Sequence, residues 1–324
     1  MAWKRSAYRW ISVNVAAAAL AASLFFGYQF LKYRMTEEFE PKVWSEPHDI
    51  LGDLTRPNQT LHWTRKTGFR NTFDIIVTTN GHGFRVTPPA PGATKSIVFF
   101  GCSYTFGPGV EDRETYPYLV GEALGGSVAT YNISFNGWGP HEMLAALQSG
   151  LVETMVKEPP ELVMFLTITD HVRRVIGREA QPWMARSPRF VLEDGMAIRK
   201  GTFADDPLRK QHSNSDPGYW SSFTPEDFQL YGAVVGAARD EVARKFPGAR
   251  FEVVLWETDR NPARGPVVEA LRANGITAHV SDEFLADNAD GPFRYMISEQ
   301  ERHPNPEGLR LLARFVETRL FNKD

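Results

Sequence analysis

A serine and a histidine stand where they could act together as a nucleophile and its base. Ser103 lies in the segment 101–107, Gly-Cys-Ser-Tyr-Thr-Phe-Gly, directly after an apolar run, and His303 lies shortly before the C-terminus. Serine is a poor nucleophile until a base removes its proton, and that base works best when a carboxylate orients it. By itself, a serine after a strand is more often a helix or turn cap. The pair therefore indicates acyl chemistry only if the fold brings both side chains together.

The elements that must position these residues follow a regular pattern. Residues 96–100 form a short apolar run, typical of a strand covered on both faces. Further strands are expected at 128–133, 162–166, 251–256 and 276–280. Helices are expected at 117–124, 140–156, 225–246, 266–274 and from about Pro306 onward. This alternation predicts a three-layer α/β/α sandwich with a parallel five-stranded sheet of the flavodoxin-like kind. Ligands bind at the carboxyl ends of such strands, where Ser103 stands.

Four segments resemble, in order and in placement at strand ends, the sequence blocks of the SGNH (GDSL) hydrolases. The segment 101–107 resembles G-D-S-x-T-x-G, and 303–305, His-Pro-Asn, resembles the last block, in which D-x-x-H or D-x-H precedes P-N. Residues 132–139 follow the second strand, as the block that binds the oxyanion does in the family. Residues 167–170, Thr-Ile-Thr-Asp, stand where the family has G-x-N-D.

The resemblance covers about residues 94–324 and extends weakly upstream. Residues 79–85, Thr-Asn-Gly-His-Gly-Phe-Arg, are similar to an N-G/S-x-G-[FL]-R segment that often precedes the domain in bacterial members. The family relationship implies an SGNH hydrolase-type domain that acts on ester bonds.

The resemblance also implies a role for each residue of the site. Ser103 would attack an ester carbonyl, and His303 would take its proton and return it to the leaving alcohol. The backbone N–H groups of Ser103 and Gly137 would bind the oxyanion. Thr169 takes the place of the family's asparagine as the third donor, although its hydroxyl reaches less far, and Asn136 could substitute for it.

The chain departs from the family pattern at two places. Cys102 replaces the aspartate of G-D-S and is a rival nucleophile, but the glycine spacing frames Ser103. Three residues before the histidine stands Gln300, which cannot stabilise an imidazolium as a carboxylate does. Glu301 matches the D-x-H variant and is the expected triad acid, with Glu299 as the second choice.

Other polar residues near the strand ends could bind substrate. These are Asn136, Asp170, His171 and Arg173. For His171, a strand-end histidine bonded to its neighbours is the more common case. For Arg173, binding of an anionic glycan and an ordinary surface position are equally expected. Four tryptophans could stack on sugar rings or pack in the core: Trp138, Trp183, Trp220 and Trp256. No histidine spacing matches a metal site and there is no HExxH or CxxC, so we expect no metal and no cofactor.

The N-terminus predicts a membrane segment. Residues 10–31 carry no charge, and a helix of about 22 residues spans about 33 Å, enough to cross a bilayer core. Lys4, Arg5 and Arg9 precede it, so residues 1–9 are expected to be a cytoplasmic tail and the body extracytoplasmic, for instance periplasmic. A cleaved signal peptide is the alternative.

The remaining chain divides into two expected parts. Residues 32–93 read as a stalk and N-terminal extension, and residues 94–324 as the hydrolase-type domain, with an insertion at about 173–222. The 324 residues have a net charge of −3, which gives no reason to expect nucleic acid as a partner. The single cysteine excludes an internal disulfide.

Three functions remain open. The first is a serine esterase that removes acyl groups, expected to be O-acetyl, from a carbohydrate or other envelope substrate. The second is an O-acyltransferase acting on an exported polysaccharide, and the third is a glycan-binding protein with a decayed site. The expected partners are an acylated carbohydrate or small ester as substrate, and the membrane, which the N-terminal helix would enter.

Overall fold

The computed structural model describes residues 2–35, 37–41, 44–68, 70–178, 182–206, 223–285, 293–299 and 301–322. Its centre is a five-stranded parallel sheet with the strand order β12-β11-β8-β6-β7. The strands are β6 (Lys95–Gly101), β7 (Val128–Ser134), β8 (Pro160–Thr167), β11 (Arg250–Leu255) and β12 (Ala278–Val280). The chain leaves β6 for β7 on one side and then crosses to β8 on the other. The strand order therefore reverses beside the carboxyl end of β6, which is where ligands bind in open α/β sheets.

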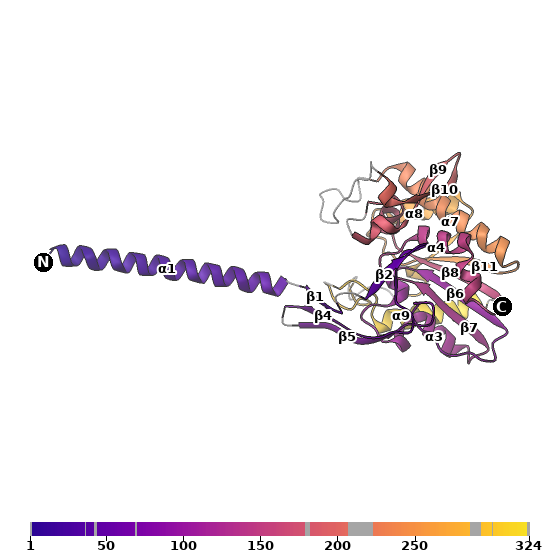
Figure 1. Ribbon diagram of the computed structural model, residues 1–324, viewed down its shortest axis with the longest axis horizontal. Helices are drawn as coiled ribbons and strands as arrows, with labels where there is room; N and C mark the ends of the chain where they lie inside the picture. The colour runs from indigo at the N-terminus through magenta and orange to yellow at the C-terminus, as the bar shows by residue number, and fades with distance from the viewer. Residues whose placement is uncertain are drawn as a thin grey trace.

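Helices cover both faces of this sheet (Figure 1). Val98 and Phe100 of β6 pack in a core shared with α4 (Pro140–Ser149), α7 (Pro225–Lys245) and α8 (Arg264–Ala273). The alternate residues Ile97 and Phe99 pack in a second core shared with α3 (Tyr116–Ala123) and α9 (Pro306–Phe315). Successive side chains of a strand point to opposite faces, so one apolar run supplies both cores. The predicted three-layer sandwich with five parallel strands is confirmed.

Two helical segments differ from the prediction. The expected helix over 140–156 is interrupted at Gly150, whose φ of +81° ends α4 before a short helix α5 (Leu151–Met155) begins. Glycine adopts this left-handed conformation without a Cβ penalty, so the chain turns there despite its apolar periodicity. After α9 the helix continues as a π-helical segment, Val316–Phe321.

The expected insertion at 173–222 contains ordered structure in its described part. A short helix α6 (His171–Val175) is followed by a 3-10 turn η2 (Pro182–Arg186) and an antiparallel hairpin of β9 (Pro188–Glu193) and β10 (Met196–Thr202). Another 3-10 turn, Phe203–Asp205, follows the hairpin. The insertion ends where Thr224 caps α7 by accepting a hydrogen bond from the N–H of Asp227 at 3.3 Å. Residues 207–222, including Trp220, lie outside the described residues.

Residues 37–78 form strands that pack on the main domain. β1 (Glu37–Glu40), β4 (Thr60–Thr67) and β5 (Arg70–Thr78) make one antiparallel sheet, and β2 (Ser45–His48) pairs with β3 (Gly52–Thr55). Trp44 and Trp63 stack at a centroid distance of 4.9 Å. Trp44 also lies 4.8 Å from Phe135 and 6.1 Å from Phe106, two residues of the main domain. The segment expected to be a stalk and extension thus shares a core with the strand ends.

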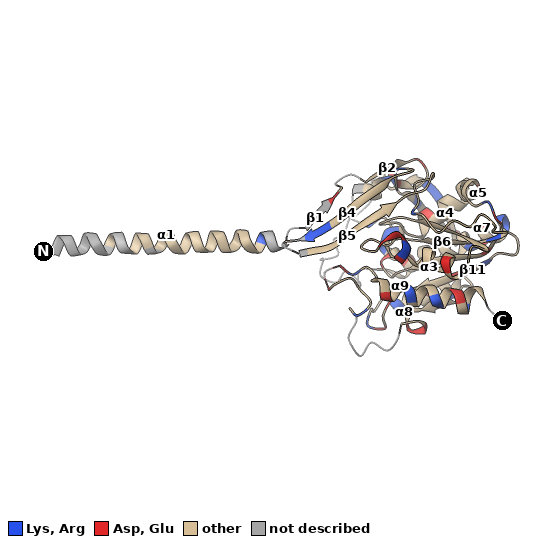
Figure 2. Ribbon diagram, turned by 90° about the horizontal axis from the view of Figure 1, so that it is seen from below, with Lys and Arg blue, Asp and Glu red and all other residues tan. Residues whose placement is uncertain are grey.

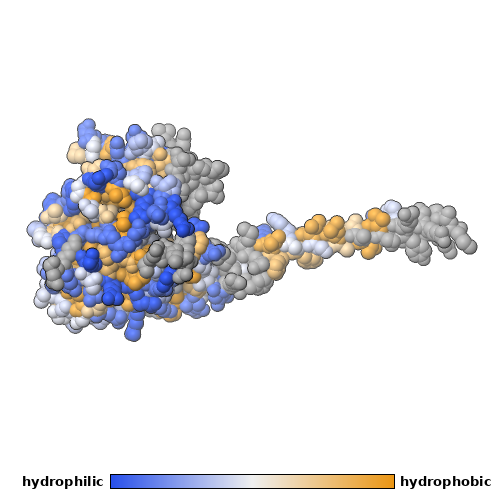
Figure 3. Space-filling view, turned by 180° about the vertical axis from the view of Figure 1, so that it is seen from behind, coloured by the Kyte–Doolittle hydropathy of each residue, from blue (hydrophilic) through white to orange (hydrophobic). Residues whose placement is uncertain are grey.

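A long helix precedes this sheet. α1 spans Ala2–Met35, and within it Val13–Lys32 is long and apolar enough to cross a membrane, with a mean hydropathy of 1.4 and none of it buried. Figure 1 shows α1 projecting from the body beside β1, and Figure 3 shows apolar residues along it, in contrast to the mixed surface of the body. A membrane anchor and a signal sequence both have this length and composition.

Candidate active site

Ser103 begins α2 (Ser103–Phe106), two residues after β6 ends at Gly101. The turn after β6 is tight, and the side chain of Thr105 lies close to the backbone of Gly101. A Cβ at position 101 would collide with Oγ1 of Thr105, so only glycine permits this close approach. The N–H groups of Thr105 and Phe106 donate to the carbonyl of Cys102 at 3.0 and 2.9 Å. Ser103 is 5% exposed, at the carboxyl end of the strand where the strand order reverses.

Cys102 points away from this position. Its side chain is fully buried in the hydrophobic core on the α3 and α9 side of the sheet, together with Ile97 and Phe99. A thiol in such surroundings behaves as a small apolar side chain. The geometry therefore gives the rival nucleophile no access to a substrate.

His303 pairs with Glu301. The Nδ1 atom of His303 contacts Oε1 of Glu301, whose residue is 1% exposed. The backbone N–H of Glu301 donates to Ser298 Oγ at 2.9 Å and fixes the loop that carries both residues. Glu299, the second choice for the acid, is exposed, and Gln300 lies outside the described residues. The structure thus places the expected triad acid, and not its alternative, against the imidazole.

The end of this loop is held at the start of α9. Asn305 caps the helix by accepting a hydrogen bond from Gly308 N–H at 3.0 Å, and its amide donates to the carbonyls of Arg294 and Met296. Pro306 fills the first helical turn, where no N–H is needed. His303 therefore lies two residues before Asn305, which these hydrogen bonds hold in place.

Tyr104 connects the two halves of the site. It follows Ser103 directly, and its ring lies 5.6 Å from the imidazole of His303, edge to face. Its hydroxyl donates to the carbonyl of Arg302 at 2.8 Å. The residue next to the candidate nucleophile thus packs on the candidate base and bonds to the base's chain neighbour, so the fold brings together segments 200 positions apart.

The protonation state of His303 follows from its surroundings. Burial, together with the positive charges of Arg65 and Arg174, lowers the pKa of His303 to about 3. The ring is therefore neutral at pH 7. Because a carboxylate faces Nδ1, the ring hydrogen lies on Nδ1 and the lone pair on Nε2. A neutral imidazole with a free Nε2 is the form that can accept a proton from a serine.

Gly137, the expected second oxyanion donor, adopts a φ of +82° after β7. A Cβ added there would lie 2.7 Å from Nε1 of Trp183, so the indole of the insertion stands directly over the glycine. Nε1 of Trp183 is buried and has no hydrogen-bond partner among the described residues, and the same holds for Oδ1 of Asn136. A buried donor and a buried acceptor without partners thus flank the glycine.

The chain after Gly137 is fixed by charged side chains from two helices. Arg174 donates to the carbonyl of Trp138 at 2.7 Å, and Glu142 accepts from the N–H of Gly139 at 2.7 Å. Trp138 itself donates through Nε1 to the carbonyl of Asp53 in the N-terminal sheets at 3.2 Å. The segment is therefore held in one conformation before any ligand binds.

Thr169 has other partners than an oxyanion. Its hydroxyl donates to Oε2 of Glu257 at 2.6 Å and accepts from Nδ2 of Asn261 at 2.9 Å. A hydroxyl has one hydrogen, and here Glu257 takes it. Burial raises the pKa of Glu257, and the hydrogen bond from Thr169 opposes that rise. The third oxyanion donor that the sequence predicts is thus engaged elsewhere in this structure.

The remaining candidate substrate-binding residues are built into the start of α6. Asp170 binds Arg173 with both oxygens, at 3.1 and 2.6 Å, and also pairs with Arg174 at 3.2 Å. His171 is fully buried, with Nδ1 2.9 Å from Thr167 Oγ1, and burial lowers the pKa of His171 well below its ordinary value. His171 therefore packs in the core and bonds to its neighbour Thr167. The alternative interpretation, a contact with substrate, does not fit this position.

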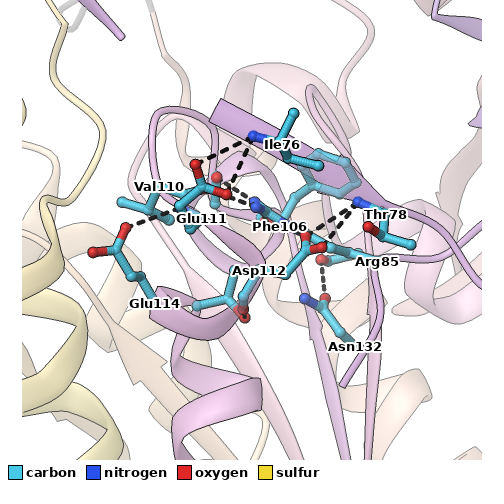
Figure 4. A network of polar contacts seen from close by, with 12 residues as sticks. Ile76, Thr78, Arg85, Phe106, Val110, Glu111, Asp112, Glu114 and Asn132 are labelled. Atoms are coloured by element: carbon cyan, nitrogen blue, oxygen red, sulfur yellow. Dashed lines mark hydrogen bonds and ion pairs between the residues drawn. The ribbon is translucent and has the colours of Figure 1, made fainter. Parts of the chain in front are cut away.

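Arg85 fixes the loop that follows α2, the helix that begins at Ser103 (Figure 4). Its guanidinium is completely buried and donates to the carbonyls of Phe106, Gly107 and Val110 and to Oδ1 of Asp112. Figure 4 also shows the carboxylates of this loop turned toward the edge of β5, where Asp112 accepts from the N–H of Thr78 at 3.1 Å. The upstream segment 79–85 thus has a physical function: it holds the loop behind Ser103.

Three residues of the site have no signal in the sequence pattern. Arg65 lies in a polar, threonine-rich strand, Trp183 is one of eight tryptophans, and Glu257 follows an ordinary apolar strand. Each becomes visible only through its contact with a residue far away in the chain. Among the described residues, no group of three His, Cys, Asp or Glu side chains could hold a metal ion.

Comparisons with known proteins give distant likenesses only. No family model matches the chain, and no curated protein does. A lipolytic protein of the G-D-S-L family from Veillonella parvula is 17% identical, with a TM-score of 0.43 over 71% of this chain and 100% of that one. A family two carbohydrate esterase from Clostridium thermocellum is 14% identical, with a TM-score of 0.41 over 75% and 68%.

A third solved structure, a carbohydrate acetylesterase family member from Sinorhizobium meliloti, is 10% identical, with a TM-score of 0.40 over 70% of this chain and 97% of that one. At such identities and TM-scores, the activities of these proteins do not transfer to this chain. What its own site can do rests on the residues around Ser103 and His303.

Proposed function

We propose that the protein is a serine esterase in which Ser103 is the nucleophile, His303 the general base and Glu301 the triad acid. The observation that carries this proposal is the contact of Glu301 with His303 Nδ1, beside the ring of Tyr104, the residue that follows Ser103. A neutral histidine that is oriented by a buried carboxylate, and whose ring packs on the residue after a strand-end serine, supports nucleophilic acyl transfer, which needs a base oriented in this way.

The reaction would proceed in two halves. In the first, Nε2 of His303 takes the Oγ proton while Ser103 forms a bond to the acyl carbon, and the same proton then leaves with the alcohol. In the second, water gives a proton to Nε2 and bonds to the acyl carbon; the bond from that carbon to Ser103 Oγ then breaks, and Oγ takes the proton back from Nε2, which releases the acid and restores the hydroxyl and the neutral base. The backbone N–H groups of Ser103 and Gly137 would hold the oxyanion in both halves.

The acyl group is expected to be small. The indole of Trp183 stands over Gly137 and fills the space that a longer acyl chain would need beside the oxyanion donors. An acetyl ester on a carbohydrate or another envelope substrate fits this restriction. The unpaired Nε1 of Trp183 and Oδ1 of Asn136 would then hydrogen-bond the alcohol part of the substrate.

The site would face the extracytoplasmic side of a membrane. The positive residues that precede the span Val13–Lys32, together with the span itself, support an uncleaved anchor with a cytoplasmic N-terminus. Cell fractionation and N-terminal sequencing of the mature protein test this part: an N-terminus beyond residue 32 would show cleavage of a signal peptide.

The activity is tested with the full chain in detergent micelles. Aryl acetate hydrolysis and labelling by a fluorophosphonate probe are expected for the wild type and are expected to vanish in Ser103→Ala. Trp183→Ala should shift the preference from acetate toward butyrate and hexanoate esters. Equal hydrolysis by wild type and Ser103→Ala would refute the assignment of the nucleophile.

An acceptor glycan in the same assay separates the remaining functions. Release of free acetate as the main product supports the esterase, whereas acetylated glycan exceeding free acetate supports the O-acyltransferase. Absence of both products and of probe labelling, together with glycan binding, would identify a binding protein with a decayed site.

A further inference from the structure

Arg65, a residue of β4 in the N-terminal sheet, reaches the candidate triad. Its Nη1 atom pairs with Oε2 of Glu301, the oxygen that does not face His303. The side chains of Arg65 and Glu301 are only 14% and 2% exposed, so the pair is shielded from water. The two residues are 236 positions apart in the chain, and β4 belongs to a different sheet from the strands that carry Ser103.

A carboxylate as buried as that of Glu301 needs a counter-charge. Without one, the buried carboxylate would carry an uncompensated desolvation cost and would lack a fixed orientation. A Glu301 that is not oriented could no longer hold the imidazolium that forms when His303 accepts a proton. A guanidinium supplies the charge and, through its planar fork, also fixes the orientation of the carboxylate.

We propose that Arg65 is a positioning residue of the triad, which binds Glu301 Oε2, compensates the charge of that buried carboxylate and directs its other oxygen at His303 Nδ1. This inference rests on the proposed function. It extends the site to a fourth member from the N-terminal sheet, and it makes that sheet part of the catalytic apparatus.

The same contact has an electrostatic cost for the base. The groups facing His303 are Glu301 from its own loop, Arg65 from β4, Arg174 from α6 and the ring of Tyr104 from α2. Burial lowers the pKa of His303, and the two arginines lower it further. Removal of Arg65 must therefore raise the pKa of His303, while the loss of an oriented carboxylate lowers the rate.

The test uses the full chain in detergent with Arg65→Gln, Arg65→Lys and, as matched control, Lys66→Gln. Lys66 is the next residue of β4 and is exposed. Arg65→Gln is expected to reduce kcat roughly ten- to a hundredfold, the range for a misplaced catalytic group. It should also move the acid limb of the kcat/KM profile upward by about one pH unit. Arg65→Lys keeps the charge and should restore the limb, and Lys66→Gln should match the wild type.

A double-variant cycle separates positioning from a general effect on the fold. If Arg65 acts through Glu301, then Arg65→Gln should cost little in a Glu301→Gln background, because the partner is already lost. This double variant also removes both buried charges together, so it should fold where Arg65→Gln alone leaves an unpaired carboxylate. Additive losses of kcat, or an acid limb unmoved by Arg65→Gln, would overturn the inference.

A measurement without turnover distinguishes failure of this inference from failure of the proposed function. The imidazole of His303 is titrated by NMR, with its resonance assigned through His303→Gln. A rise of about one unit in Arg65→Gln and none in Lys66→Gln supports the coupling even if no ester is hydrolysed. An unchanged titration in a chain that does hydrolyse esters would refute the coupling and leave the esterase intact.

Discussion

Removal of Arg85 should test how strongly the upstream segment 79–85 holds the loop behind Ser103. The variant Arg85→Met keeps most of the buried aliphatic volume and removes the guanidinium. Three backbone carbonyls then lose their donor, at Phe106, Gly107 and Val110, and Asp112 loses its ion pair. Arg85 is 0% exposed, so water does not replace these contacts in the folded state.

The expected loss follows from these contacts. Each buried carbonyl left without a donor costs on the order of 1 kcal/mol, and the unpaired Asp112 adds about 1 to 2 kcal/mol. Burial lowers the pKa of Arg85, which reflects a desolvation cost that the variant no longer bears. We therefore expect the free energy of unfolding to fall by about 4 kcal/mol, a large part of the stability of an ordinary domain.

Urea unfolding of the full chain in detergent, followed by tryptophan fluorescence, measures this loss. Arg113→Met is the matched control, because Arg113 is an exposed arginine of the same loop and its replacement should cost less than about 0.5 kcal/mol. Labelling of Ser103 by a fluorophosphonate should slow in Arg85→Met and remain normal in the control. If the two variants unfold within 1 kcal/mol of each other, the buried network does not hold the loop in the way described.

Three further changes address the oxyanion side and the core. Gly137→Ala combines a φ of +82° with a Cβ 2.7 Å from Trp183, so unfolding assays should show a loss of about 1 to 3 kcal/mol and probe labelling should nearly stop. Thr169→Val should change kcat less than about tenfold, because its hydrogen binds Glu257; a loss near a hundredfold would restore Thr169 as an oxyanion donor. The pKa of His171 is lowered by burial, so the folded state binds fewer protons than the unfolded state below pH 6.5, and stability falls as the pH decreases through that value. His171→Phe should make the slope of unfolding free energy against pH, measured between pH 6 and 5, shallower by up to about 1.4 kcal/mol per unit.

The fold was accessible from the sequence because the strands of the central sheet are buried on both faces. Such strands must be apolar throughout, and the run at 96–100 supplies both cores with alternate side chains. The helix predicted over 140–156 breaks at Gly150, which adopts a left-handed backbone conformation. Periodicity alone does not show where an apolar helix bends.

The site was accessible only in part. Ser103 and Gly137 lie just after β6 and β7, and His303 lies just before α9, as the sequence predicts. Their catalytic roles stay predictions. The partners of Glu301 and Thr169 depend on contacts between distant segments, which no local pattern encodes. Nothing in the sequence distinguishes Arg65 from other polar residues of a strand. Its proposed role follows from its ion pair with the carboxylate of Glu301.

The register of β1 on β4 limits how far the site can lie from the end of α1. Phe39 pairs with Arg65, and α1 ends at Met35, so about four residues, or at most about 14 Å of extended chain, separate the helix from the strand pair. The basic part of β4 lies at the α1 end of the N-terminal sheet (Figure 2). The connection between α1 and β1 is therefore short.

If α1 stays in a bilayer, Glu301 is held near the lipid headgroups. Under the proposed function, the protein would then meet its substrates in a thin layer of solution along the membrane. A polymer would be processed as it emerges at the surface or while still tethered to lipid, and esters deep in the surrounding matrix would lie out of reach. Cleavage after α1 would release that restriction, so retention or loss of the helix would decide which population of esters the protein can reach.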